Sequence, residues 1–564
     1  QAVAQVPSDP MMNVYKLHGQ TRRYQFTYTE LDDGRMLLEW GIERNTKWQS
    51  GSFLMTAEAV EAGDAQSFLM PEDGRHVELP SNETYAMISR LALRQLRANG
   101  NMLYNGLRYH LLDSAEHAIG EALLHVKDDV DGSEMWILGD SRWPRVWRMA
   151  GNPFGQNWQV RPSEHITCSV AAELRMCPDK AGSIYYAYQA PEASDASHAP
   201  LGFQPFYVSH YGRHGSRWIT DDSRYRAVID AMENDTANLT PLGLDVYHRL
   251  LVVWDDARGH GGELTPLGNR QHHDIAVRLS QRLPQLFGHP AAGIIARSST
   301  AGRCMMSMAA FCDGLKEQNP KLNITREASA RDMEFIVHNT PEAKYNSDSD
   351  DAPWRAKFRA FEDSVLHPER LVSTLFIDPS KVANHRGFME GLYWIAVDMQ
   401  NVEPDVSFYD VFTHDELYNI WQTINYRMYE ANVRYDDGKP GPGPESARVL
   451  LQRIVADADK AVAADRPSAD LRFGHDTNLI RLLALMQADI MDYNASNPDT
   501  YKDAWQDFRV SPMAANLQMI FYRNKSGDII VQLLHNERDI HLPVKVESGP
   551  FYSWNALREY LMAR

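Results

Sequence analysis

A histidine stands between two arginines in the stretch Arg213-His214-Gly215-Ser216-Arg217. The apolar run Phe206-Tyr207-Val208 before it is typical of a β-strand, so we expect this histidine on a short loop at a strand end. Imidazole is a nucleophile, and guanidinium groups bind phosphate oxygens through paired hydrogen bonds. Gly215 lets the backbone turn tightly. The stretch predicts phosphoryl transfer through His214, with Arg213 and Arg217 holding the phosphate; the alternative is a basic surface loop.

A second apolar run, Gly293 to Ala296, ends in Arg297-Ser298-Ser299-Thr300 and precedes a predicted helix over 301–315. Small hydroxyl residues at a helix start leave its N–H groups accessible, which favours anion binding. Arg297 is therefore predicted to supply a third guanidinium, the alternative being a strand-end surface arginine. Arg303, farther along, is expected to make a structural ion pair.

A third polar cluster, Gly474-His475-Asp476-Thr477, follows the predicted short strand 471–473 and begins a predicted helix over 478–486. A histidine beside a carboxylate suits acid–base work on a phosphate ester. His475 is predicted to donate to a phosphoryl oxygen, and Asp476 to protonate the leaving alkoxide and then to accept a proton from water. The alternative is an N-cap aspartate beside a buried histidine.

The 564-residue chain has a formal net charge of −18 and no apolar run long enough to span a membrane. Binding to nucleic acid or to an anionic membrane is not expected as the main function. The partner predicted instead is a small-molecule phosphomonoester, drawn by a local cationic pocket. The oligomeric state stays open. Because the chain starts at Gln1 without an initiator methionine, a removed signal peptide is compatible with it, and we expect export to the periplasm or cell surface.

No cofactor and no metal are predicted. The adjacent His272 and His273 point about 100° apart on a helix and so cannot hold one metal ion together; they are interpreted as surface or core histidines. The acidic run 345–351 lacks the spacing and closing glutamate of a calcium loop. Cys304 and Cys312 lie too far apart on a predicted helix to bridge, whereas a pairing of Cys168 with Cys177 stays open.

The predicted organisation has a β-rich α+β N-terminal domain over 1–160, an α/β core over 161–320 and 465–564, and a mostly helical cap over 321–464. In the first domain, 24–28 and 36–40 read as a β-hairpin, 52–55 and 135–138 as strands, and 81–98 as a helix. Its tryptophans Trp143, Trp147 and Trp158 either pack in a small core, which is favoured, or line a carbohydrate- or surface-binding face.

Two features support the core. Thr265 followed by Pro266 predicts the capped start of an amphipathic helix. Residues 516–523 and 528–534 predict a hairpin across Asn524-Lys525-Ser526-Gly527. The predicted fold class is α/β, with a mixed, mainly parallel sheet flanked by helices and carrying the helical cap.

The motifs at 213–217, 297–303 and 474–479 together resemble the acid phosphatase and phytase branch of the histidine phosphatase superfamily. The segments Glu263–Gly268 and Pro512–Leu517 support the resemblance, which covers about residues 165 to 564. It implies a metal-independent phosphomonoester hydrolase in which His214 is phosphorylated on nitrogen. Arg213, Arg217, Arg297 and His475 would bind the phosphoryl group, and Asp476 would be the proton donor.

Two departures limit this resemblance. The family usually has a proline two residues after the second arginine, where this chain has Trp218-Ile219, and residues 1–160 have no counterpart in the family's common layout. Around the first motif the chain is similar to multiple inositol polyphosphate phosphatases, whereas the His475-Asp476 pair is more similar to bacterial phytases. Inositol phosphates are the expected substrates; alternatives are sugar phosphates or nucleotides, a phosphomutase, or a non-catalytic phosphate-binding protein.

Overall fold

The structure is a computed structural model. It describes residues 11–17, 20–31, 33–44, 47–69, 76–112, 117–118, 121–139, 143–151, 157–161, 170–191, 197–289, 292–464, 466–491, 500–546 and 550–564. The chain forms two compact units, residues 1–173 and 174–564, which are described separately. Among the described residues no helix is long and apolar enough to cross a membrane.

The first unit is built on a twelve-stranded sheet, in which β10 pairs with β11 and the other strands follow the order β6-β4-β3-β2-β1-β14-β13-β12-β11-β9-β8. Neighbouring strands are antiparallel except for β4 and β6, which are parallel. The strands are β1 (Met11–Leu17), β2 (Gln20–Glu30), β3 (Met36–Arg44), β4 (Lys47–Met55), β6 (His76–Glu78), β8 (Asn101–Tyr104), β9 (Leu107–Leu112), β10 (His117–Ala118), β11 (Glu121–Asp128), β12 (Glu134–Leu138), β13 (Val146–Ala150) and β14 (Asn157–Arg161). The short strands β5 (Ala65–Gln66) and β7 (Glu83–Thr84) pair separately.

The predicted hairpin is confirmed, because β2 and β3 pair antiparallel with Tyr28 opposite Leu38. Gly34 in the turn has a φ of 82°, a conformation that favours glycine. The predicted strands 52–55 and 135–138 lie within β4 and β12.

The helix predicted over 81–98 is shorter than expected. Helix α2 spans Arg90–Asn99, and the cap is Ser89, whose hydroxyl accepts from the N–H of Ala92, rather than Ser81. Residues 83–84 form β7 instead. The predicted stop is correct, since Gly100 adopts the left-handed conformation at the C-cap. Helix α1 spans Ala57–Ala62.

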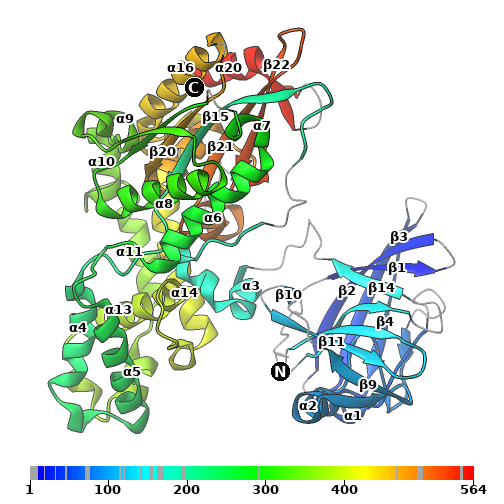
Figure 1. Cartoon of the computed structure of the whole chain (residues 1–564). Helices are drawn as coiled ribbons and strands as arrows, with labels where there is room; N and C mark the ends of the chain where they lie inside the picture. Colours follow the sequence, from blue (N-terminus) through cyan, green and yellow to red (C-terminus); the bar gives the residue numbers. More distant parts are fainter. Residues whose placement is uncertain are drawn as a thin grey trace. The chain divides into compact units, whose positions relative to one another are not determined.

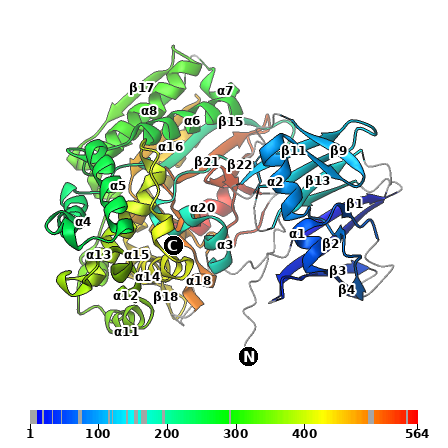
Figure 2. The same ribbon diagram turned by 90° about the horizontal axis from the view of Figure 1, so that it is seen from below.

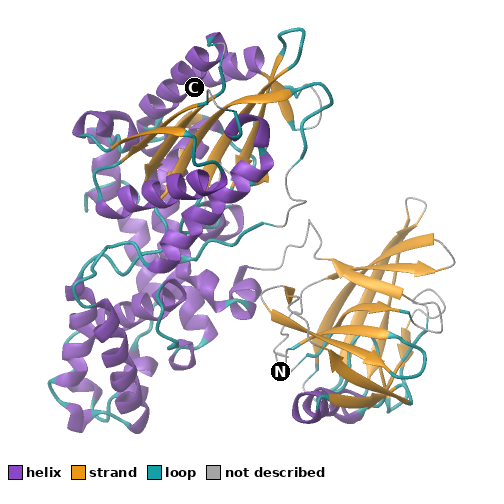
Figure 3. Cartoon of the chain, viewed as in Figure 1, coloured by secondary structure: helices purple, strands orange, loops and turns teal. Residues whose placement is uncertain are grey.

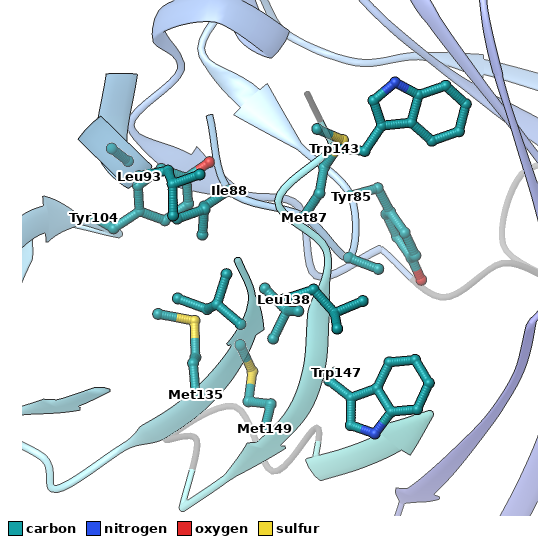
Figure 4. Close-up of a cluster of buried hydrophobic side chains, with 14 of the residues drawn as sticks. Tyr85, Met87, Ile88, Leu93, Tyr104, Met135, Leu138, Trp143, Trp147 and Met149 are labelled. Carbon is teal, nitrogen blue, oxygen red and sulfur yellow. The ribbon is translucent and has the colours of Figure 1, made fainter. Parts of the chain in front are cut away.

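Trp143 and Trp147 are each only 7% exposed. Figure 4 shows both with aromatic and aliphatic side chains of a cluster that includes Tyr85, Met87 and Leu138. The packing interpretation of these two tryptophans is therefore correct, and they line no binding face. The side chain of Trp158 lies outside the described residues.

The second unit is built on an eight-stranded sheet, in which β24 pairs with β22 and the other strands follow the order β17-β16-β20-β15-β21-β22-β23. Figure 1 shows β15, β20 and β21 side by side, and Figure 2 shows the same sheet from below. The strands are β15 (Gln204–Arg213), β16 (Gly293–Ser298), β17 (Asn323–Glu327), β20 (Ser468–Gly474), β21 (Asn516–Arg523), β22 (Ile529–His535), β23 (Arg538–Asp539) and β24 (Phe551–Ser553). The predicted hairpin 516–534 is confirmed as β21 and β22.

Strands β17, β16, β20 and β15 run parallel to one another, whereas β21, β22, β23 and β24 pair antiparallel. The sheet is mixed, as predicted, but it is not mainly parallel. The reason is that the C-terminal part of the chain returns in tight turns, which can join only antiparallel strands.

Helices flank the sheet on both faces (Figure 3). Side chains of α6 and α8 pack with Val208, Ile294 and Leu471 in one apolar core. Helix α16 contacts β15 and helix α20 contacts β22. The helices between β14 and β17 are α3 (Val170–Met176), α4 (Asp222–Glu233), α5 (Pro241–Ala257), α6 (Pro266–Arg282), α7 (Pro284–Phe287) and α8 (Gly302–Gln318), and α4 and α5 pack mainly against each other and against helices of the predicted cap rather than against the sheet. The helices from α16 onward are α16 (Arg448–Ala463), α17 (Asp476–Met486), α18 (Tyr501–Ala504), α19 (Asp507–Val510) and α20 (Trp554–Met562).

Between β17 and β20 the described chain is helical apart from connecting loops and one small hairpin, β18 (Tyr435–Asp436) with β19 (Lys439–Pro440). Its helices before α16 are α9 (Met333–Ile336), α10 (Pro341–Asp348), α11 (Arg355–Val365), α12 (Glu369–Leu375), α13 (His385–Asp398), α14 (His414–Asn432) and α15 (Pro442–Ser446). The role of this region as a cap stays a prediction.

Candidate active site

The ends of two neighbouring parallel strands place the two predicted histidines together. In the register of β15 with β20, Arg213 lies opposite Gly474, so His214 and His475 follow at the same edge of the sheet. The backbone N–H of His214 donates to the carbonyl of Gly474 at 3.0 Å. The two imidazole rings lie 5.8 Å apart, edge to face.

The loop that carries His214 is fixed by a close approach to α6. A Cβ on Gly215 would come within 2.4 Å of the carbonyl oxygen of Gly268, and one on Gly268 within 2.2 Å of the carbonyl oxygen of Ser216. Both positions therefore require glycine. The predicted helix start is confirmed: Thr265 caps α6, Pro266 is its first residue, and the Thr265 hydroxyl accepts from the N–H of Gly268.

His214 is 2% exposed, and its Nδ1 lies 2.9 Å from the carbonyl oxygen of Gly215. A carbonyl only accepts, so Nδ1 carries the proton and the lone pair of a neutral ring is on Nε2. Burial, together with Arg213, Arg217 and Arg303, lowers the pKa of His214 well below its ordinary value. The ring therefore stays neutral and nucleophilic in acid.

Arg213 and Arg217 are both buried beside this ring. Arg213 donates through Nη1 to the carbonyls of Ile184 and Ser511, while its Nε and Nη2 have no hydrogen-bond acceptor within the described structure. Burial lowers the pKa of Arg213 to about 10. Nη1 of Arg217 donates to the hydroxyl of Tyr185 and to the carbonyl of Trp218, both at 2.9 Å, and its Nε is likewise without an acceptor. Buried guanidinium N–H groups that lack an acceptor favour the binding of an anion.

Arg297 does not join this group. Its Nη1 lies 3.1 Å from Asp470 and its Nε 3.2 Å from Glu327. The cause is the alternation of side chains along β16: Ile294, Ala296 and Ser298 lie on the buried face, and Arg297 points to the opposite one. Its prediction as a phosphate ligand is therefore wrong, and the strand-end alternative describes it better.

Arg303, in contrast, lies near both histidines of the site. No ion pair of Arg303 is found among the described residues, contrary to expectation, and its Nε is buried without an acceptor. Its charge acts on His214 and on His475, and burial together with Arg217 lowers the pKa of Arg303 itself. The sequence signal that could have found it is its position in the first turn of α8, directly after the polar strand end.

His475 and Asp476 lie at the N-terminus of α17, with His475 at the N-cap position. Burial lowers the pKa of His475 to about 4, against the opposing charge of Asp476. Its Nε2 lies 3.2 Å from the hydroxyl of Ser299. The carboxylate of Asp476 lies 3.5 Å from Nη2 of Arg213 and accepts from the N–H of Thr477 at 2.8 Å.

The pKa of the buried Asp476 carboxyl group is subject to opposing effects. Burial alone would raise its pKa, but Arg213, His475 and the N–H of Thr477 lower it below the ordinary value. A bound phosphate would offset the charge of the arginines and so favour the protonated acid.

Sequence reasoning also missed residues that support the site. Tyr185 holds Arg217 by its hydroxyl and by its ring, 4.6 Å from the guanidinium carbon. The hydroxyl of Ser307 accepts from the N–H of Gly215, and Ser216 is held by Gln271 and Asn401. These residues lie far from 213–217 in the sequence and show no motif, so only the folded chain reveals them.

His272 is a core histidine, fully buried, whose Nε2 donates to the carbonyl of Arg213 at 2.9 Å. His273 pairs instead with Glu317 near the surface. Cys304 and Cys312 are buried free thiols on α8. Cys168 lies outside the described residues, so the structure does not address its pairing with Cys177. Among the described residues no group of histidine, cysteine and carboxylate side chains is arranged to hold a metal ion.

The model of the histidine phosphatase superfamily (branch 2) matches residues 213–536. The match covers more than half of the 564 residues, and the chain therefore belongs to this family, in agreement with the resemblance seen in the motifs. Family membership supports phosphatase activity for this chain. The comparison with curated protein sequences gives no significant match.

Solved structures share the fold. The multiple inositol polyphosphate phosphatase of Bifidobacterium longum in complex with inositol hexasulfate has a TM-score of 0.57 at 18% identity, covering 68% of this chain and 97% of that one. Its complex with phosphate has a TM-score of 0.56 at 19% identity, covering 68% and 98%. The phytase from D. castellii reaches a TM-score of 0.48 at 14% identity, covering 68% and 84%. The family match and the likeness to the Bifidobacterium longum structures establish a histidine acid phosphatase-like fold with mixed α/β content.

The sequence Trp218-Ile219, where the family usually has a proline, does not loosen the loop. The indole N–H of Trp218 donates to Asp256 at 2.8 Å, and its ring stacks on His260. Ile219 is fully buried. Aromatic stacking and one hydrogen bond thus fix the chain here.

Proposed function

We propose that this protein is a metal-independent phosphomonoester hydrolase that works through a phosphohistidine at His214, with inositol phosphates as its substrates. The observation that carries the proposal is the neutral His214, buried beside the guanidiniums of Arg213 and Arg217 and in the field of Arg303. Each of these arginines keeps at least one buried N–H without an acceptor. Such a site matches the charge of a phosphate and leaves the nucleophile unprotonated.

In the first half of the cycle, Nε2 of His214 attacks phosphorus in line with the ester oxygen. The P–N bond forms as the P–O bond breaks, and protonated Asp476 gives its proton to the leaving alkoxide. The arginines and His475 stabilise the charge on the phosphoryl oxygens during transfer.

In the second half, the carboxylate of Asp476 accepts a proton from water, whose oxygen attacks phosphorus. The P–N bond breaks, and inorganic phosphate and neutral His214 result. Every step uses groups of this chain.

Inositol phosphates are proposed as the substrate class because the fold resembles that of a multiple inositol polyphosphate phosphatase crystallised with inositol hexasulfate. The His475-Asp476 pair, which resembles that of bacterial phytases, is compatible with the same class. Sugar phosphates and nucleotides are the alternatives, because each presents the same monoester to the site. Export to the periplasm or cell surface also stays a proposal.

The test is release of inorganic phosphate by the full chain, with EDTA present, from nitrophenyl phosphate and from a panel of inositol, sugar and nucleoside phosphates. Hydrolysis of nitrophenyl phosphate supports the proposal. Transfer of phosphate within the substrate without release would identify a mutase, and absence of turnover on every ester would identify a phosphate-binding protein. Preference for sugar or nucleoside phosphates over inositol phosphates would reject the substrate class alone.

A further inference from the structure

A recess between α11, α13 and α14 contains a guanidinium that the site described above does not use. Arg427 of α14 lines this recess together with Glu362 of α11 and with Glu390 and Trp394 of α13. The side chain of Arg427 is exposed to solvent. Its location on one wall of a concave surface makes it accessible to a ligand rather than buried as a structural charge.

Arg427 makes no hydrogen bond and no ion pair with any described residue, although two carboxylates share its recess. The reason is that Arg386 already binds both: its Nη2 lies 2.9 Å from Glu362 and its Nε 2.9 Å from Glu390. With its nearest carboxylates held by another arginine, Arg427 keeps its full set of donors for a further anion.

Two more arginines add to the local charge. Desolvation lowers the pKa of Arg427 most, and Arg355 of α11 and Arg224 of α4 lower it further, whereas Glu362 and Glu390 act in the opposite direction. Arg224 makes only a 3.4 Å hydrogen bond to Thr220. Because Glu362 and Glu390 are already held by Arg386, these arginines favour an anion in the recess on a chain whose net charge is −18.

The recess is joined to the candidate active site by two aromatic rings. Trp394 lines the recess, and its ring centroid lies 4.9 Å from that of Tyr185. Tyr185 in turn covers the guanidinium of Arg217 at 4.6 Å and holds it by a hydrogen bond. Trp394 thus connects the wall of the recess to the side chain that holds Arg217.

We infer that Arg427, supported by Arg224 and Arg355, forms a second anion subsite that binds another phosphate of the substrate whose scissile phosphate is held by Arg213, Arg217 and Arg303. This inference rests on the proposed function and deepens it. The subsite selects substrates with two or more phosphates, while Trp394 and Tyr185 provide the apolar wall between them.

The experiment measures inhibition of nitrophenyl phosphate hydrolysis by two anions, in the wild type and in Arg427→Gln. Inositol hexasulfate presents several anionic groups, whereas inorganic phosphate presents one. Loss of one charge-assisted contact is expected to raise the inhibition constant of inositol hexasulfate about tenfold. The constant for inorganic phosphate and the kcat for nitrophenyl phosphate should change less than about twofold.

Lys357→Gln is the matched control. Lys357 is exposed on α11, the helix that also carries Arg355 and Glu362, and its substitution removes one positive charge outside the recess. It should leave both inhibition constants unchanged, and Arg427→Lys should recover part of the affinity for the hexasulfate. An equal effect of Arg427→Gln on both anions, or none on either, would overturn the subsite. A wild type inactive on nitrophenyl phosphate would instead overturn the proposed function, so the two failures are distinguishable.

Discussion

The arginines at the carboxyl ends of β15 and β16 lie in two different environments. Arg297, on β16, has Asp470 and Glu327 as partners. Arg213, on β15, is fully buried; its Nε and Nη2 make no hydrogen bond within the described structure, and the carboxylate of Asp476 lies 3.5 Å from Nη2. Both follow an apolar strand and look alike in the sequence. What separates a structural arginine from a ligand-binding one is whether the fold already supplies a hydrogen-bonded counter-charge.

The same contrast appears farther along β16 and α8. Arg303, the second residue of α8, follows closely on the strand that carries Arg297, yet it belongs electrostatically to the group around His214. In the neighbouring strand, Arg472 is as deeply buried as Arg213 but is neutralised by Asp457 at 2.8 Å. Burial alone therefore does not mark a functional arginine.

The strongest test of this contrast removes the imidazole of His214, which lies in the field of Arg213, Arg217 and Arg303. His214→Ala should reduce kcat by about 10⁵- to 10⁶-fold, because no second nucleophile replaces the imidazole. The measurement is steady-state hydrolysis of nitrophenyl phosphate together with alkaline quenching of a reaction with labelled substrate. The wild type should retain label on the protein and the variant none. Label on the variant would place the nucleophile elsewhere.

Asp476→Asn removes the proposed proton donor and leaves the arginines around His214 in place. The kcat for an alkyl phosphate should fall about 10²- to 10⁴-fold, because its alkoxide needs a proton to leave. Nitrophenyl phosphate, with a stable leaving group, should still phosphorylate His214. Initial rates with both substrates on one preparation give the ratio. Normal rates with both would show that Asp476 is not the donor.

Arg303→Ala and Arg297→Gln compare an unpaired arginine with a paired one directly. The first should lower kcat/KM by about 10²- to 10³-fold through lost stabilisation of the transferring phosphoryl group. The second should change kcat/KM less than about threefold, since Arg297 is turned toward Asp470 and Glu327. The two values are measured with one substrate at one pH. Larger loss in Arg297→Gln would reverse the assignment.

The paired arginine should instead affect stability. Arg297→Gln leaves the partly buried Asp470 without its counter-charge and is expected to cost about 1–3 kcal/mol in the free energy of unfolding. Chemical denaturation of the variant and the wild type gives this difference. Arg303→Ala, which breaks no ion pair of the described structure, should be less destabilising.

The pH profile is expected to show the smallest effect. Because burial and the arginines lower the pKa of His214, protonation should not stop nitrophenyl phosphate hydrolysis near the ordinary histidine value of about 6.5. Activity on alkyl phosphates should fall as pH rises, since Asp476 must be protonated to act as an acid. Profiles of kcat/KM for both substrates, with EDTA present, test this. An acid limb near 6.5 for nitrophenyl phosphate would contradict the neutral buried imidazole.

Local patterns predicted many elements well. The hairpin of β2 with β3 followed from alternating apolar residues around a glycine turn, and the start of α6 from Thr265 and Pro266. The start of α2 was predicted nine residues too early, because Ser81 and Ser89 are both good caps and the short pairing of β5 with β7 decides between them. The sequence predicts a mainly parallel sheet, but β21, β22 and β24 pair antiparallel, because short turns join the strands near the C-terminus.

Residue order alone places the reactive side chains at the strand ends: His214 with Arg213 and Arg217, and His475 with Asp476. Local order along the chain sets these neighbours, and parallel strands bring their carboxyl ends to one edge. Only the tertiary structure decided between Arg297 and Arg303, and revealed Tyr185 and Arg427. Counter-charges such as Asp470, Glu327 and Arg386 come from distant parts of the chain, and the free or paired state of an arginine exists only once they have met.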